Sequence, residues 1–244
     1  MTSPRASRPR AAASPARRAA VAGGILLVVV LAALGIRATL EADREARGRR
    51  RQAFVTALRD LARAEAAAAE RRVVDLDGDG LPEFLFWQEL AGLAGPRTSP
   101  DGYARGDRLA PPLLDPAGRE VWGKGIVHAG GALGHLVKVY LPAGPGRASE
   151  EGLPGAGFRG AVDGDLAERR WCAYAWGRGE PGEAFFVDAS GRVLASDNAD
   201  RHYMAADLVP AWDAAFTRGA SGGWDAPVAA GTVGNDGRLW RPVE

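Results

Sequence analysis

The stretch Trp171–Ser196, WCAYAWGRGEPGEAFFVDASGRVLAS, decides the fold class. Its first two runs, Trp171–Trp176 and Glu183–Ala189, are rich in the aromatic and β-branched residues that favour strands. The connection GRGEPG separates them, and the turn residues DASG lead into a third apolar run, Arg192–Ala195. Gly, Pro, Asp and Ser are the residues that tight turns require. The stretch therefore predicts an antiparallel meander of three strands.

Weaker signals flank this meander. Leu133–Pro142 alternates apolar and polar residues as a strand does, whereas Leu85–Leu93 is apolar and fits either a strand or a short helix. The Gly-rich segments Gly95–Arg119 and Gly144–Gly164 predict loops. Asp207–Arg218 has apolar residues at helical spacing, and the tail DGRLWRPV predicts a final edge strand.

A long helix is predicted before the sheet. Glu41–Arg71 contains no Pro and only one Gly, and it is rich in the helix formers Ala, Arg and Glu. Helical spacing places five apolar residues on one face: Phe54, Leu58, Leu61, Ala64 and Ala68. Glu65 falls on the same face, so the strongly apolar part is expected to end near Leu61. We expect this stripe to pack on the sheet, the alternative being a solvated charged stalk. A helix followed by a small antiparallel sheet is an α+β fold.

The run Ala19–Ile36 carries no charged side chain and is long enough for a helix to cross a lipid bilayer. Five arginines and no acid precede it. A basic tail before one apolar helix favours an N-terminus inside and a domain outside the inner membrane, with lipid as a partner. A cleaved signal peptide is the alternative. The predicted parts are a basic tail (1–18), a transmembrane helix (19–36), its amphipathic continuation (37–71) and a soluble domain (72–244).

Composition and motifs give no sign of catalysis. The formal net charge is +1, so no basic field would attract nucleic acid. Gly155–Gly160 matches GxGxxG, but it lacks the preceding strand and following helix of a dinucleotide site, so no nucleotide is expected. The three histidines show no metal-ligand spacing, and Cys172 is the only cysteine. The sequence predicts that the chain is not an enzyme.

The sharpest local motif is the acidic stretch DLDGDGLPE, residues 75–83. Asp75, Asp77 and Asp79 alternate along a Gly-containing turn and can surround one side of a hard cation, with Glu83 and the Leu81 carbonyl as further ligands. The twelfth position of the loop is a phenylalanine, so an EF-hand is disfavoured. The pattern resembles the DxDxDGxxD calcium loops of FG-GAP repeats, although it occurs once here. The prediction is a calcium site, and the alternative is an acidic turn that binds nothing.

Three stretches together resemble type IV pilin-like and pseudopilin-like proteins of type II secretion: RQAFVTALRDLARAEAAAAER, DLDGDGLPEFLFWQELAGL and the meander. The resemblance implies a membrane-anchored structural or interaction component of a cell-envelope apparatus, with envelope proteins or other pilin-like subunits as partners. The chain departs from those families in lacking a Glu at the fifth position after Gly23 or Gly24, where the prepilin cleavage motif has one. A calcium-dependent binding module and an enzyme of unknown class are the alternative functions.

Overall fold

The computed structural model divides the chain into two units, Met1–Gly48 and Arg49–Glu244. It describes residues 15–98, 108–114, 120–122, 125–129, 135–152, 158–179 and 182–243. Within these ranges, side chains are described except at residues 15–31, 120–122, 127–129 and 158–159. Helix α1, Pro15–Glu70, begins in the first unit and ends in the second. The first unit contains no other described element.

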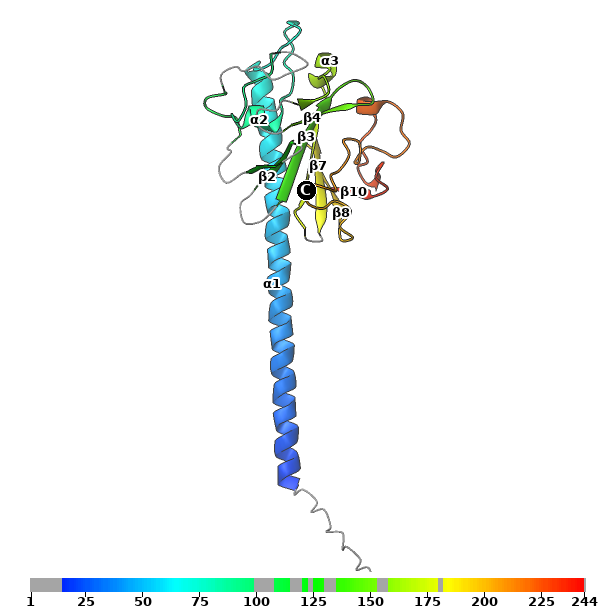
Figure 1. Cartoon of the computed structure of the whole chain (residues 1–244). Coiled ribbons are helices and arrows are strands. Elements are labelled where there is room, and N and C mark those ends of the chain that lie inside the picture. The colour runs from blue at the N-terminus through cyan, green and yellow to red at the C-terminus, as the bar shows by residue number, and fades with distance from the viewer. Residues whose placement is uncertain are drawn as a thin grey trace, which may run out of the picture. The chain divides into compact units, whose positions relative to one another are not determined.

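The second unit is built on one antiparallel sheet (Figure 1). Its described strands are β1 (Glu120–Trp122), β2 (Ile126–Ala129), β3 (His135–Pro142), β4 (Ala148–Glu151), β5 (Phe158–Arg159), β6 (Cys172–Gly177), β7 (Glu183–Asp188), β8 (Val193–Asp197), β9 (Thr232–Val233) and β10 (Leu239–Pro242). The order is β1-β2-β3-β6-β7-β8-β10-β9, while β4 pairs with β3 and β5 pairs with β4. Two four-residue helices, α2 (Trp87–Leu90) and α3 (Gly164–Ala167), and the 3-10 turn Gly223–Asp225 lie in the connections.

The predicted meander is confirmed as β6, β7 and β8. Tyr174 pairs with Phe186, and Phe186 pairs with Leu194. These three side chains belong to one buried cluster, whereas their neighbours Val187 and Val193 belong to another. Because successive side chains of a strand point to opposite faces, the sheet carries a core on each side. That explains why the strands are apolar on both faces rather than alternating.

Helix α1 covers one face of the sheet through its residues in the second unit. Phe54, Leu58 and Leu61 are buried in the same cluster as Phe185. The rings of Phe54 and Phe185 stack at 5.0 Å between centroids. Figure 1 shows this part of α1 beside β2 and β3. The expected packing of the stripe on the sheet is confirmed, and a free stalk is contradicted for residues 49–70.

The C-terminal segment covers the other face. Trp212 and Trp224 stack at 4.6 Å between centroids, and Phe216 meets Phe186 of the sheet edge-on. The helical spacing in Asp207–Arg218 does not form a helix. The segment instead consists of turns and isolated bridges. Its aromatic rings pack in the buried cluster on this face of the sheet although the backbone is irregular.

The predicted fold class needs correction in the size of its sheet. A small sheet was expected, and the described residues form ten strands. The expected loop Gly144–Gly164 contains β4 and β5, because β3 is long enough to pair with β4 beyond its pairing with β2. The C-terminal run is β10, which is not an edge strand because it pairs with both β8 and β9.

The predicted membrane helix is also contradicted. No helix in the part of the chain whose side chains are described has a stretch that is long and apolar enough to cross a bilayer. From residue 32 onward α1 carries charged side chains such as Arg37 and Glu41, which form an exposed ion pair. Residues 19–31 of the predicted span lie outside the side chains that are described. The predictions of a transmembrane helix and of an inner-membrane location are therefore wrong.

Candidate functional site

The acidic loop folds into a tight turn held by its own carboxylates. The Asp75 carboxylate accepts the amides of Gly78 (2.9 Å) and Gly80 (3.1 Å) through its two oxygens. The Asp77 carboxylate accepts the amide of Asp79 at 3.2 Å. Both glycines have positive φ, 75° and 90°, a conformation that side chains with a Cβ rarely adopt. The turn thus keeps the three aspartates close to one another.

The structure brings five carboxylates together here. Oxygens of Asp75, Asp77 and Asp79 lie within 4.8 Å of one another, and Asp77 forms a second group of this kind with Asp165 and Glu168. Sequence reasoning missed the last two residues, because they come from α3 and the residue after it, far along the chain. No pattern in the sequence around residues 75–83 indicates that these two carboxylates lie near Asp77.

Backbone contacts position α3 against the acidic loop. The amide of Phe84 donates to the carbonyl of Ala167 at 2.9 Å. A Cβ at Gly164 would lie 3.6 Å from an Asp77 oxygen, so the start of α3 is close to the loop. The Asp163 side chain accepts the amide of Leu166 and fixes the first turn of α3. This turn carries Asp165 and Glu168 toward the loop.

The five carboxylates have no arginine partner among the described side chains. Arg72 is near Gly80, yet neither it nor Arg71 forms an ion pair with the aspartates. Loss of water and the neighbouring carboxylates of Asp79 and Asp77 raise the pKa of Glu168. Hard oxygen ligands with excess negative charge suit a calcium or magnesium ion.

Glu83, the expected fourth ligand, is not part of either group of three carboxylates, although one of its oxygens lies near the start of α3, as an Asp77 oxygen does. Its side chain is 1% exposed. One oxygen accepts the amide of Leu76 at 3.1 Å, and the other binds the Arg97 guanidinium at 2.8 Å. Glu83 therefore ties the acidic loop to Arg97, and Asp165 and Glu168 bring two carboxylates near Asp77 that the sequence analysis did not include.

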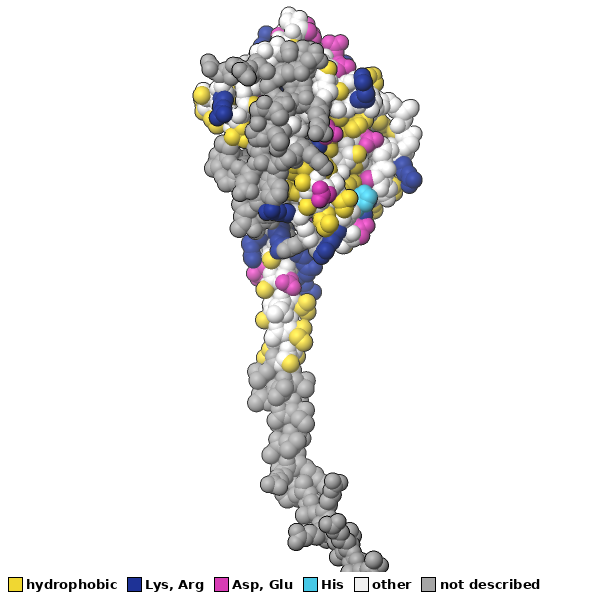
Figure 2. Space-filling view, in the orientation of Figure 1, with side chains coloured by type: hydrophobic (Ala, Val, Ile, Leu, Met, Phe, Trp, Pro, Cys, Tyr) yellow, Lys and Arg dark blue, Asp and Glu magenta, His cyan; other side chains and the backbone are white. Residues whose placement is uncertain are grey.

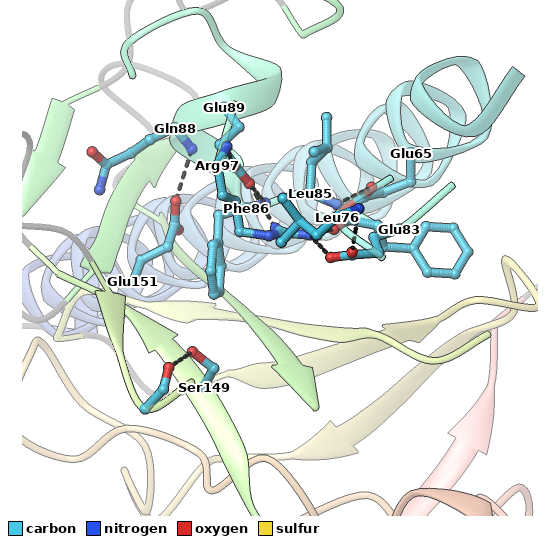
Figure 3. Close-up of polar contacts among 12 residues, drawn as sticks. Glu65, Leu76, Glu83, Leu85, Phe86, Gln88, Glu89, Arg97, Ser149 and Glu151 are labelled. Atoms are coloured by element: carbon cyan, nitrogen blue, oxygen red, sulfur yellow. Dashed lines mark hydrogen bonds and ion pairs between the residues drawn. The ribbon is translucent and has the colours of Figure 1, made fainter. Parts of the chain in front are cut away.

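Behind the loop lies a buried polar network (Figure 3). Arg97, fully buried, donates to Glu83, to Glu89 at 2.9 Å and to the carbonyl of Phe84 at 2.7 Å. Glu89 also accepts the amides of Phe86 and Arg97, both at 2.7 Å. Segment 83–98 has only the short α2 as regular structure, so these side chains satisfy backbone groups that a sheet or helix would otherwise satisfy.

The remaining sequence motifs contribute nothing to this site. Gly155–Gly157 of the GxGxxG match lie outside the described residues, as does the His128 side chain. His135 is buried beside Phe54, with ring centroids 4.7 Å apart, and His202 is exposed beside Tyr203.

Comparison with models of known protein families, with curated proteins and with solved structures gives no match. The resemblance to pilin-like and pseudopilin-like proteins has no support from these comparisons and stays a prediction from sequence.

Proposed function

We propose that this chain is a non-catalytic structural protein that self-associates through the described part of α1 in its first unit. The observation that carries the proposal is the exposure of large apolar side chains there. Leu34, Ile36 and Leu40 are 58%, 61% and 51% exposed. Figure 2 shows apolar side chains along this stretch. Ile36 and Leu40 are four residues apart and share one side of the helix, and exposed apolar side chains that lie together in water are typical of an interaction site.

The spacing and charge of this face fit a second copy of the same helix. Ala33, Ile36 and Leu40 recur at intervals of three and four residues, the spacing of the apolar residues in a helix–helix seam, and Arg37 and Arg44 lie beside them. Glu41 lies between the two arginines and pairs with Arg37 at 2.8 Å. A face with both charge signs can exchange ion pairs with an identical face, and most soluble oligomers are built from identical chains.

Charging the apolar face is expected to prevent association. The full chain should sediment as an oligomer, and Ile36→Glu with Leu40→Glu should sediment as a monomer because the seam would bury two carboxylates. Ala38→Glu, which is exposed and lies off the face, is the control and should still associate. A monomeric unmodified chain at all concentrations would rule out this function.

A second candidate function is cation-dependent binding, and it rests on Asp77. This residue belongs to both groups of three carboxylates, one within the loop and one shared with Asp165 and Glu168. A calcium ion there would connect the loop to α3 and neutralise the repulsion among the carboxylates. This second function is tested by thermal stability, not by the self-association of the chain.

Calcium and a chelator should have opposite effects on Asp165→Asn. In chelator the substitution is expected to raise the melting temperature, because it removes one repelling charge. In calcium the unmodified chain should be the more stable, since a bound ion contributes about 2.7 kcal/mol at a hundredfold excess over Kd. The exposed Asp43→Asn serves as a control with no effect in either buffer. Identical melts of the unmodified chain in both buffers would show that the loop is only a turn.

A further inference from the structure

Two buried carboxylates hold segment 83–98 through backbone hydrogen bonds, and neither forms an ion pair with a described basic side chain. Glu65 of α1 is 1% exposed and accepts the amide of Leu85 at 3.0 Å. Glu151 at the end of β4 is 1% exposed and accepts the amide of Gln88 at 2.7 Å. Each contact joins the segment to a different element, one to the helix and one to the sheet (Figure 3).

Each of these carboxylates uses only one oxygen. Glu65 Oε1 and Glu151 Oε2 are buried and have no hydrogen-bond partner among the described residues. Gly125 packs against Glu151 so closely that a Cβ there would come within 2.4 Å of the Glu151 Cβ. A side chain at position 125 therefore has no room beside the start of the Glu151 side chain. An ionised oxygen buried without a partner is strongly unfavourable.

The charges around the pair do not balance it. Glu65 faces Glu89, Arg97 and Glu151, and Glu151 faces Glu89 and Lys138. Arg97 is already bound to Glu83 and Glu89, the latter in α2. Lys138 of β3 binds Glu150 at 2.6 Å. The excess negative charge of the network thus falls on Glu65 and Glu151.

We propose that Glu65 and Glu151 form a proton-controlled clasp, which holds segment 83–98 on α1 and the sheet while both carry protons and loosens when they ionise. A protonated carboxyl keeps its carbonyl oxygen as the acceptor of the Leu85 or Gln88 amide, so the contact survives protonation. Ionisation does not remove the acceptor, but it puts an uncompensated charge in the core, and this cost is relieved only when segment 83–98 moves away and water reaches the carboxylates.

The direction of the pH effect follows from the pKa values. Burial raises the pKa of Glu151 to about 8 and raises that of Glu65 well above its ordinary value. In the unfolded chain both ionise near their ordinary value of 4.5. The stabilisation is therefore complete below that value and is lost as pH rises through the folded pKa. Between the unfolded and the folded pKa, each proton that only the folded chain holds makes the folding equilibrium constant fall about tenfold for every unit by which the pH rises.

The test is hydrogen exchange and thermal melting of the full chain from pH 5 to pH 9. The protection factors of the Gln88 and Leu85 amides should fall as pH rises. Glu151→Gln keeps the accepting oxygen and cannot ionise, so it should melt at a higher temperature than the unmodified chain at pH 9 and show a shallower pH dependence. Glu65→Gln should act in the same direction, and the exposed Glu70→Gln is the matched control.

Two results would overturn the clasp. Protection factors at Gln88 and Leu85 that stay constant over this pH range would show that no proton controls the segment. The same conclusion would follow if Glu151→Gln and Glu65→Gln lowered stability equally at every pH. The exchange measurement on the unmodified chain decides the question even where a variant does not fold.

Discussion

Leu58→Asp is expected to unfold the second unit. The Leu58 side chain is fully buried between α1 and the sheet, in the same cluster as Phe54 and Leu61. Replacing a buried Leu with Ala costs about 2–5 kcal/mol. Asp also places an unpaired carboxylate in the apolar layer, and this penalty adds to the lost packing. The sum is comparable to the whole stability of a domain, about 5–15 kcal/mol.

Denaturant titrations of the full chain, monitored by circular dichroism, measure this effect. Leu58→Ala should lower the unfolding midpoint, and Leu58→Asp should leave the sheet unfolded before denaturant is added. Thr56→Asp introduces the same charge two residues earlier at an exposed position, so it should change the midpoint little. Equal midpoints for both Asp variants would mean that α1 does not pack on the sheet.

The meander was predictable because each of its strands is specified locally. Trp171–Trp176 and Glu183–Ala189 carry strand-forming residues, and the turn at Gly191 has the positive φ of 73° that its Gly allows. β4 was not predictable in the same way. Its sequence, ASEE, has no strand-forming residue, and its place in the sheet comes from pairing with β3. Tertiary pairing overrides local preference there.

Glu65 shows the limit of periodicity along α1. A carboxylate on the apolar face indicated that the buried stripe ended before it, yet Ala64 and Ala68 on either side are buried as well. Its partner is the backbone amide of Leu85, twenty residues away. Nothing in the spacing of a helix shows that an irregular segment will cross it and need an acceptor.

The acidic loop was only half predictable for a similar reason. Asp75, Asp77 and Asp79 are set by turn chemistry within six residues. Asp165 and Glu168 reach them only once the chain has passed through the sheet. The membrane prediction failed on different grounds, because it rested on a run of uncharged residues, whereas the described part of α1 has no apolar stretch of sufficient length.

Arg97→Met is expected to lower stability by about 3–5 kcal/mol at neutral pH, because it leaves buried carboxylates without their cation. Glu83 and Glu89, which are 1% and 0% exposed, would lose their ion pairs at 2.8 and 2.9 Å. The Phe84 carbonyl would lose its donor too. Met has a similar length and keeps the apolar packing, so the change reports mainly on charge.

Two further variants separate charge from packing at Arg97. Adding Glu83→Gln and Glu89→Gln to Arg97→Met removes the orphaned charges and should recover much of the loss. Arg63→Met breaks a surface ion pair with Asp60. The Arg63 side chain is 75% exposed, so the substitution should lower the free energy of unfolding by less than about 1 kcal/mol. Burial raises the pKa of Glu89 and the nearby Arg97 lowers it, so without the guanidinium Glu89 ionises less readily when folded, and the damage from Arg97→Met should shrink as pH falls. If Arg97→Met and Arg63→Met shifted the unfolding midpoint equally, the buried network would contribute no more than a surface ion pair, and segment 83–98 would be held by its apolar contacts alone.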